Sequence, residues 1–337
     1  MNRISALAQN FILVFSGGMG LASYQAGAYE YFRNALGKEP NWITASSAGA
    51  VNAALIAGNE PRKRIEALRT FWRENRVWTA PGSSIIPRGA VRHASNWFSA
   101  IQARLTGSAG LFHPRWPDSP LSPFKSLYDL LPMQRRLERL VDFELLNSSD
   151  IRLSIATTDI QTGEQVVFDT CKQTIGIEHV MASCGLLPEF APVEIDGRLL
   201  GDGGLSSNAP VGLILGEPSQ GPRTILVLDL FARDGARPTS LAEAIARKND
   251  LMFSNHTLDA LQSYFAGLKA ADFQEVRDTV CYLSYRAPAD EAGPEKLFDF
   301  SDATVIMRWN NGALDMAEAL TLLRSGHRTT PLILVRR

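Results

Sequence analysis

The sequence has almost no net charge and very few cysteines. Its 34 Lys and Arg residues nearly balance 35 Asp and Glu residues, for a formal net charge of −1. This argues against a nucleic-acid partner, since such proteins favour a basic surface. The three cysteines, Cys171, Cys184 and Cys281, are odd in number and lack metal-ligand spacing, which indicates a reducing compartment. We expect no metal ion and no cofactor, because no cluster of His, Cys and acidic residues stands out.

Long hydrophobic segments are also missing. Residues 1–9 have neither the basic start nor the apolar centre of a signal peptide. The apolar run Phe11–Phe15 is too short to cross a bilayer. These absences predict a cytoplasmic protein whose membrane contact, where it occurs, is peripheral.

What is present is an alternation of short apolar runs and helical patterns along the 337 residues. This alternation predicts an α/β fold with a mainly parallel central sheet sandwiched by helices in three layers. The expected strands are 11–15, 42–45, 151–157, 165–169, 193–200 and 224–230. The expected helices are 23–36, 48–58, 61–75, 131–142, 174–183 and 210–215.

The stretch Asn41–Leu55 carries the clearest chemical signal. An apolar run ends at small residues around Ser47, and an alanine-rich helical pattern follows directly. This is the layout of a nucleophile elbow, in which a strained turn between strand and helix exposes one hydroxyl. Gly49 favours Ser47 over Ser46, although Ala45 replaces the first glycine of G-x-S-x-G. The alternative is a serine that only caps the N-terminus of a helix.

A glycine-rich loop, Ser16–Ala22, lies one strand-helix unit earlier. Its glycines allow backbone amides to approach a ligand, and the helix that follows directs its positive end to the same place. Such a loop suits a phosphate or the oxyanion of acyl transfer. Ser23 occupies the place where a dinucleotide-binding fingerprint needs its third glycine, and the Lys-Ser/Thr pair of a Walker loop is absent.

The third segment, Asp196–Val211, contains Asp202-Gly203-Gly204 after a strand candidate. Asp196-Gly197 is a hairpin signal, and an isolated Asp-Gly-Gly is itself a common turn. Functionally, Asp202 would serve as a general base if it lies within hydrogen-bonding reach of a serine.

Taken together and in this order, the three segments resemble the patatin-like phospholipases, which are calcium-independent lipid acyl hydrolases. The resemblance covers roughly residues 10–230 and includes two further stretches, around Thr157-Thr158-Asp159 and Ala182-Ser183-Cys184. Each block is short, but the joint order and spacing make chance an unlikely explanation. The resemblance implies a patatin-like fold and the hydrolysis of carboxylic esters of lipids, of the phospholipase A or lysophospholipase type.

By the same resemblance, Ser47 would be the nucleophile and Asp202 the general base of a dyad without histidine. Gly17, Gly18 and Met19 would form the oxyanion hole through their backbone amides. Four positions depart from the family pattern: Met19, Leu21, Ala22 and Ala45. Because amides rather than side chains would bind the oxyanion, these changes bear on the strength of the hole and need not abolish it.

Two other functions are open from the residues alone. An α/β-hydrolase with a Ser-Asp-His triad fits the chain order Ser47, Asp202 and then His256 or His327, although the elbow falls early for that fold. The altered glycine-rich loop also allows a catalytically weakened module that only binds lipid.

Residues 80–117 contain no Asp or Glu, four arginines and several aromatic residues. Val91, Ala94, Trp97, Phe98, Ile101 and Leu105 fall on one face of a helix. One interpretation is a lid insertion at 80–130 whose residues 88–116 touch a membrane surface. The other is a helix that packs its apolar stripe on the core while its arginines are simply solvated.

The C-terminal third has no mechanistic signal. Ser240–Leu268 and Ser301–Leu323 are helical patterns, and Val280–Tyr285 is a strand candidate. We therefore expect a catalytic domain at 8–235 and a C-terminal helical extension at 236–337 packed on it. Such extensions resemble those of some bacterial patatin-like proteins, and this one could cover the sheet edge, form a partner surface or narrow the acyl pocket.

Overall fold

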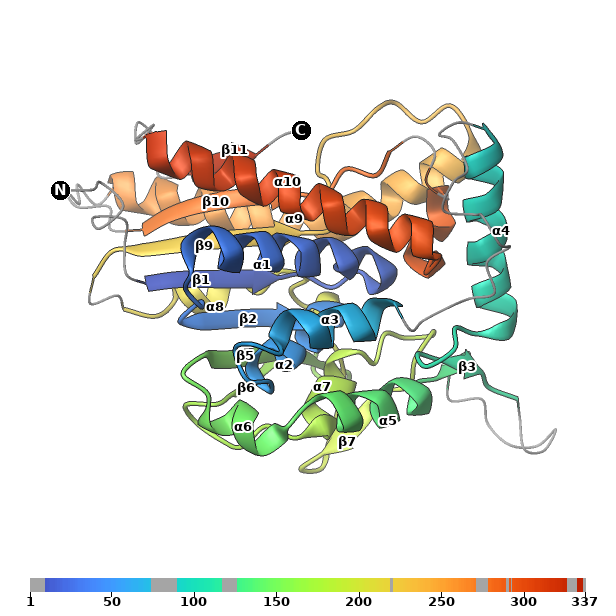
Figure 1. The fold of residues 1–337 in the computed structure, drawn as a ribbon, viewed down its shortest axis with the longest axis horizontal. Coiled ribbons are helices and arrows are strands. Elements are labelled where there is room, and N and C mark those ends of the chain that lie inside the picture. The colour runs from blue at the N-terminus through green and yellow to red at the C-terminus, as the bar shows by residue number, and fades with distance from the viewer. Residues whose placement is uncertain are drawn as a thin grey trace.

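A mostly parallel sheet forms the centre of the computed structural model, which describes residues 10–73, 90–116, 126–218, 221–270, 278–288, 291, 293–325 and 332–335. Its strands run in the order β11-β10-β9-β1-β2-β5-β8-β7, and β6 pairs with β5 (Figure 1). Neighbours from β11 to β5 are parallel, whereas β6 and β8 run antiparallel to β5. The bounds are β1 Asn10–Phe15, β2 Trp42–Ser46, β5 Arg152–Asp159, β6 Gln165–Asp169, β7 Val193–Ile195, β8 Arg198–Asp202, β9 Arg223–Asp229, β10 Asp278–Ser284 and β11 Leu332–Val335.

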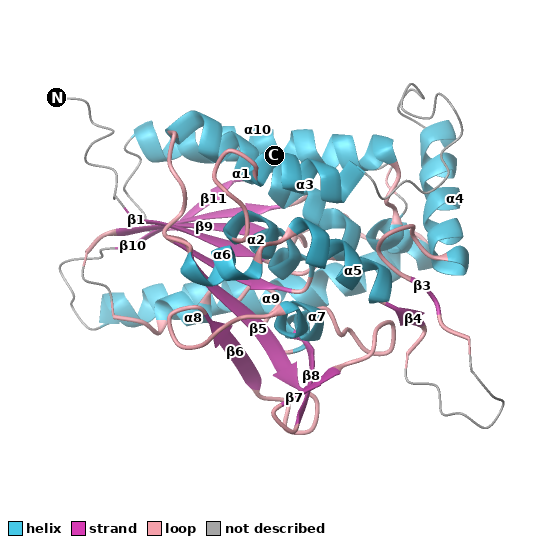
Figure 2. Cartoon of the chain, turned by 60° about the horizontal axis from the view of Figure 1, so that its bottom comes forward, coloured by secondary structure: helices cyan, strands magenta, loops and turns pink. Residues whose placement is uncertain are grey.

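Helices cover both faces of the sheet, so the predicted three-layer α/β architecture is confirmed. Figure 2 shows α1 and α10 on one side of the strands and α8 and α9 on the other. Successive side chains of a strand point to opposite faces of the sheet, so one strand contributes to two hydrophobic cores. In β1, Leu13 and Phe15 belong to one core, and Ile12 and Val14 belong to the other. The helices are α1 Ser23–Leu36, α2 Ala48–Ala57, α3 Arg64–Arg73, α4 Ala90–Thr106, α5 Leu131–Leu140, α6 Phe143–Ser148, α7 Ile177–Ser183, α8 Gly212–Leu215, α9 Leu241–Ala270 and α10 Asp302–Ser325.

One expected strand, 193–200, is two strands instead. β7 and β8 form an antiparallel hairpin whose turn holds Asp196 at φ 51° and Gly197 at φ 73°. Two positive φ angles match the twist of a tight hairpin, which explains why Asp-Gly occurs there. The reversal sends β8 back along β5, so Asp202 reaches the sheet from the direction opposite to the parallel strands.

The C-terminal part belongs to the same sheet as the rest. β10 pairs with β9 and β11 pairs with β10, so residues after 235 add two strands as well as helices. Helix α10 crosses α1 closely: a Cβ on Gly27 would lie 1.9 Å from the carbonyl oxygen of Trp309, and one on Gly312 would lie 1.9 Å from that of Tyr24. The expected helical extension is thus built into the core rather than laid upon it.

Helix α4 does not bury the apolar stripe that its sequence predicts. Trp97, Phe98 and Leu105 are 50%, 64% and 70% exposed. The side chains that face inward are small or polar, and they are Asn96, Ser99, Ala100 and Ala103. The interpretation in which this stripe packs on the core is therefore wrong for these residues. Residues 80–89 and 117–125 of the expected insertion lie outside the described part of the chain.

Candidate active site

Ser47 lies at a strained turn between β2 and α2. Its backbone is at φ 54° and ψ −128°, a conformation that non-glycine residues rarely adopt, as a nucleophile elbow requires. A Cβ on Gly49 would lie 2.5 Å from the carbonyl oxygen of Phe15, so only glycine fits where the new helix passes β1. The Ser46 hydroxyl donates a hydrogen bond to the carbonyl oxygen of Ser207 at 3.0 Å. Of the two serines, Ser47 is the one that lines the cavity.

Ser183 holds the strained residue in place. The Ser47 amide donates to Ser183 Oγ at 2.8 Å, and that hydroxyl donates onward to the carbonyl oxygen of Ala156 at 2.7 Å. Both serines are buried, so this chain of hydrogen bonds satisfies a backbone amide that would otherwise lie unpaired in the core. The sequence contained this residue only as part of a family-like stretch, and nothing in that stretch indicated contact with the elbow.

Asp202, at the end of β8, meets Ser47 at the same level of the sheet. β8 pairs Asp202 with Thr157, one residue beyond the pairing of Ser46 with Ala156. The Ser47 side chain and the Asp202 carboxyl group line the same cavity, and Ser47 lowers the pKa of that carboxyl group. Asp202 Oδ1 accepts a hydrogen bond from the Gly204 amide at 2.7 Å. The structure therefore brings together the two side chains that the sequence placed 155 residues apart.

The surroundings of Asp202 change the pKa of its carboxyl group. Burial raises that pKa from 3.8 to about 6, and Ser47 and the hydrogen bond from the Gly204 amide offset part of the rise. Cys184 lines the same cavity, and burial together with the nearby Asp202 raises the pKa of its thiol well above the usual value. A base with a pKa near 6 is ionised at neutral pH and remains basic enough to accept a proton during reaction.

The glycine-rich loop divides into an anchored part and an open part. The Gly17 amide donates to the carbonyl oxygen of Asn208 at 3.1 Å, and Asn208 Nδ2 donates back to the Gly17 carbonyl oxygen at 3.3 Å. Gly17, expected to donate to an oxyanion, is thus already engaged in fixing the loop. Among the described residues, the amides of Gly18 and Met19 have no acceptor in the protein. Met19 also lines the cavity, as does Ala48 at the start of α2.

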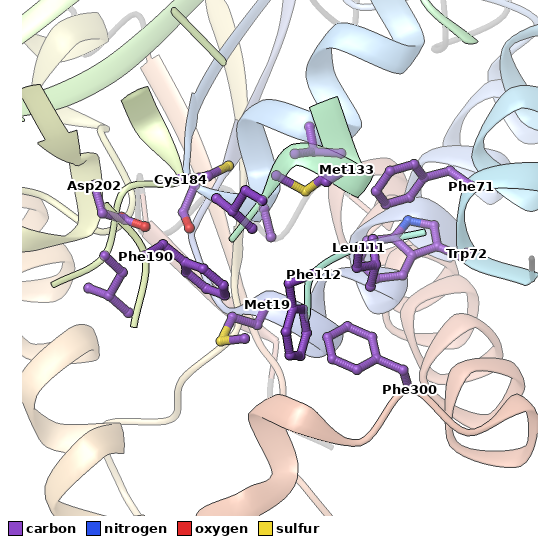
Figure 3. A pocket seen from close by; sticks show the side chains of 15 residues that line it. Met19, Phe71, Trp72, Leu111, Phe112, Met133, Cys184, Phe190, Asp202 and Phe300 are labelled. Atoms are coloured by element: carbon purple, nitrogen blue, oxygen red, sulfur yellow. The ribbon is translucent and has the colours of Figure 1, made fainter. Parts of the chain in front are cut away.

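Ser47 and Asp202 open onto a cavity of about 50 Å³ with an almost wholly apolar wall (Figure 3). In that view Asp202 and Cys184 lie on one side, and Phe71, Trp72 and Phe300 lie on the other. The apolar wall also includes Val51, Leu111, Phe112, Leu130, Met133, Leu186 and Phe190. A reactive hydroxyl at the end of an apolar cavity suits a substrate with a hydrocarbon part.

Of the two histidines of the triad alternative, the one that the structure describes does not line this cavity. His256 is exposed on α9, and His327 lies outside the described residues. His179 is buried beside Phe168 at a ring distance of 4.2 Å and accepts from the Gly176 amide, and burial lowers its pKa. Within the described ranges, no His, Cys, Asp and Glu side chains gather as a metal site would require.

The arginines expected to touch a membrane surface are partly engaged within the protein. The Arg104 guanidinium stacks over the Phe298 ring at 5.0 Å, and Arg115 pairs with Asp129 at 3.0 Å. Arg88 lies outside the described residues, and the side chain of Arg92 is not among those described. No helix in the part of the chain that the structure describes is long and apolar enough to span a bilayer.

Comparison with known proteins places this site in a family. A family model described as patatin-like phospholipase matches residues 13–215, which include Ser47, Asp202 and the glycine-rich loop. Since this match covers more than half of the chain, the protein belongs to the patatin-like phospholipase family. No curated protein sequence matches the chain.

Solved structures show more distant similarity. VipD from Legionella pneumophila is 12% identical, with a TM-score of 0.37 over 90% of this chain and 67% of that one. The type III effector ExoU is 12% identical, with a TM-score of 0.40 over 93% of this chain and 53% of that one. A structure of SpcU in complex with ExoU from Pseudomonas aeruginosa is 14% identical, with a TM-score of 0.32 over 79% and 53%. The chain therefore spans about half the length of the matched ExoU chain.

Proposed function

We propose that the protein is a serine acyl hydrolase that cleaves carboxylic ester bonds of lipids, of the phospholipase A or lysophospholipase type. The observation that supports it most directly is the placement of the strained Ser47 and the buried Asp202 carboxyl group together on the lining of one apolar cavity. Membership of the patatin-like phospholipase family supports lipid hydrolysis independently.

In the proposed reaction Ser47 Oγ attacks the ester carbonyl carbon while Asp202 accepts the hydroxyl proton. The tetrahedral intermediate collapses, Asp202 returns that proton to the departing alcohol, and an acyl-enzyme remains on Ser47. Asp202 then removes a proton from a water molecule that attacks the acyl carbonyl, and protonates Ser47 as the fatty acid leaves. A carboxylate can serve here because proton transfer accompanies formation of the bond between oxygen and carbon, and needs no free alkoxide.

The oxyanion would be stabilised by backbone amides rather than by charged side chains. Gly18 and Met19 supply amides without an acceptor among the described residues, and the Ala48 amide at the start of α2 lies next to the nucleophile. Leu21 is fully buried, so the position that usually holds Arg or Lys contributes packing and no charge in this protein. Loss of one donor of this kind costs about 3–4 kcal/mol in the reaction barrier of a well-studied protease.

A serine-directed fluorophosphonate tests the proposed nucleophile. We expect labelling of the wild type and none of Ser47→Ala, with Ser46→Ala as the matched control that keeps the label. Absence of labelling in all three would contradict the hydrolase and favour the lipid-binding module. If His256→Ala or His327→Ala abolished turnover while Asp202→Asn did not, the triad alternative would replace the dyad.

We also propose that residues 88–116 contact a lipid surface. Trp97, Phe98 and Trp116 are half or more exposed, and exposed aromatic side chains favour the boundary between water and lipid. Trp97→Ala with Phe98→Ala should lower activity on vesicles but spare a soluble short-chain ester. Leu314→Ala, at a half-exposed position on α10, is the control that should change neither. Equal loss on vesicles and soluble ester would contradict the contact.

A further inference from the structure

The C-terminal part of the chain contributes to the side of the cavity that lies away from Asp202. Phe300 is 3% exposed and lines the cavity that contains Ser47. It lies 85 residues beyond the end of the family match at residue 215. Figure 3 shows Phe300 next to Phe112, on the side away from Asp202. Part of the wall that would meet an acyl chain therefore comes from outside the segments that carry the chemistry.

Phe300 belongs to an aromatic wall made by two segments distant in sequence. Its ring centroid lies 6.0 Å from that of Phe112, which follows α4, and Phe298 packs on the same Phe112 ring at 5.9 Å. Both contacts have edge-to-face geometry, the arrangement that aromatic pairs prefer. Phe298 does not line the cavity, so the two neighbouring phenylalanines differ in access to a substrate.

A buried arginine holds the backbone on both sides of Phe298 and directly before Phe300. Arg308 of α10 is fully buried and donates to the carbonyl oxygens of Asp299 at 2.9 Å and Lys296 at 2.7 Å. Its charge is balanced by Glu291, whose Oε1 accepts from Arg308 Nε at 2.7 Å. Such a paired and fully buried network resists displacement, because breaking it would leave an uncompensated charge in the core.

The same segment presses against the glycine-rich loop. A Cβ on Gly20 would lie 3.0 Å from the carbonyl oxygen of Asp299 and 3.1 Å from Arg308 Nη1. The carboxylate of Asp299 also accepts from the Ser301 amide at 3.0 Å and from Thr304 Oγ1 at 2.7 Å. Phe300 thus sits between anchored neighbours, so its backbone cannot move away from the cavity without disturbing both α10 and the loop.

We infer that Phe300 sets the length of acyl chain that the site accepts. The cavity of about 50 Å³ has room for only a few water molecules. Growth of a bound chain past this volume would meet the Phe300 ring, which its anchored backbone holds in place. The inference rests on the proposed function, since it concerns the substrate of the same site.

The test compares p-nitrophenyl esters from acetate to palmitate. In the wild type we expect kcat/KM to fall once the acyl group exceeds the cavity. Phe300→Ala should move the maximum to longer acyl chains, with a gain of roughly fourfold for each methylene newly buried. Phe300→Leu, which keeps an apolar side chain and protects the fold, should move it less. Phe298→Ala is the matched control and should keep the wild-type profile.

Two outcomes would overturn the inference. One is an unchanged chain-length profile in folded Phe300→Ala and Phe300→Leu proteins. The other is an equal shift in Phe298→Ala, which would indicate general loosening of the aromatic wall.

A binding measurement separates this inference from the proposed chemistry. In Ser47→Ala, fatty acids of increasing length compete with a fluorescent fatty acid, and Phe300→Ala in that background should strengthen binding of the longer ones selectively. If the wild type hydrolyses no ester but this shift appears, the proposed hydrolysis fails and the wall assignment stands. If hydrolysis depends on Ser47 but Phe300→Ala changes the length dependence in neither assay, the proposed hydrolysis stands and the role of Phe300 is wrong.

Discussion

Asp202 at the end of β8 and Asp229 at the end of β9 are two buried aspartates of the same sheet. Burial raises the pKa of Asp202 to about 6 and that of Asp229 to about 7. Their partners differ, however. The Asp229 carboxylate accepts from the Tyr282 hydroxyl at 2.8 Å and the Phe231 amide at 3.2 Å, and it does not line the cavity.

Asp202 differs by facing both a cavity and the hydroxyl of an elbow. Its Oδ1 accepts a hydrogen bond from the Gly204 amide. The comparison teaches that a strongly perturbed pKa does not by itself mark a catalytic group. What separates the two carboxyl groups is access to a substrate and contact with Ser47.

The largest expected effect is the difference in activity between the Asp202 and Asp229 variants. Asp202→Asn should lower kcat on a soluble ester by roughly 10²–10⁴-fold, the usual contribution of a general base. Asp229→Asn should lower it less than about tenfold, because that side chain touches neither cavity nor nucleophile. Steady-state kinetics with thermal melts of both variants provide the measurement. A larger loss in Asp229→Asn, in a folded protein, would reverse the assignment.

The next effect concerns stability. The folded-state pKa of Asp202 lies above its unfolded value of 3.8, so its ionisation destabilises the native state as the pH rises through about 6. At about 1.4 kcal/mol per unit of pKa, this amounts to about 3 kcal/mol. Asp202→Asn should therefore be more stable than the wild type by about 3 kcal/mol at alkaline pH in urea unfolding.

The same comparison at acidic pH is the internal control for that effect. Below the unfolded pKa of 3.8 the wild-type carboxyl group is protonated in both states, so the advantage of Asp202→Asn should vanish. An advantage that persists there would mean that altered hydrogen bonds, rather than charge, explain the difference.

A smaller effect should appear in the pH profile. In the proposed mechanism Asp202 must be ionised to accept the Ser47 proton, so kcat/KM should fall about tenfold per pH unit below about 6. The midpoint should remain in Asp229→Asn, because Asp229, with its pKa of about 7, does not line the cavity and has no role in the proposed mechanism. A midpoint that moves in this variant would assign the titration to the wrong carboxyl group.

The smallest expected effect concerns the hydrogen bond from the Ser47 amide to Ser183. Ser183→Ala removes the acceptor of the Ser47 amide, a hydrogen bond worth about 1 kcal/mol, so we expect a roughly fivefold lower kcat with little change in KM. Ser46→Ala, which loses a hydrogen bond to Ser207 next door, should change kcat less. A purely structural role for Ser183 would lower thermal stability and leave kcat intact.

Much of the fold was predictable from the sequence because the period of apolar residues determines the elements. The expected bounds 23–36 and 165–169 match α1 and β6, and the run 224–230 lies one residue from β9. The order of the three blocks also allowed Ser47 and Asp202 to be proposed together. Their contact, however, depends on β8 pairing with β5, and although Asp196-Gly197 indicates the turn into β8, no local pattern specifies that partner strand.

Other features depend on contacts between distant parts of the chain. The outward face of α4 contradicts its own amphipathic pattern, because tertiary packing buries Ala100 and Ala103 instead of Trp97 and Phe98. The engagement of the Gly17 amide requires Asn208, 191 residues away. β11 is a four-residue aliphatic run that was not among the expected strands, and it pairs in parallel with β10.

The continuity of the sheet past residue 235 has a consequence for truncated forms of the protein. β9 lies between β1 and β10, and all of its residues are buried. A fragment that stops before β10 would present this apolar strand as a free edge, which is a template for self-association. Such a fragment would also uncover the groove on α1 where Gly27 receives the backbone of Trp309. Insoluble product from a shortened gene would therefore say nothing about the chemistry of Ser47.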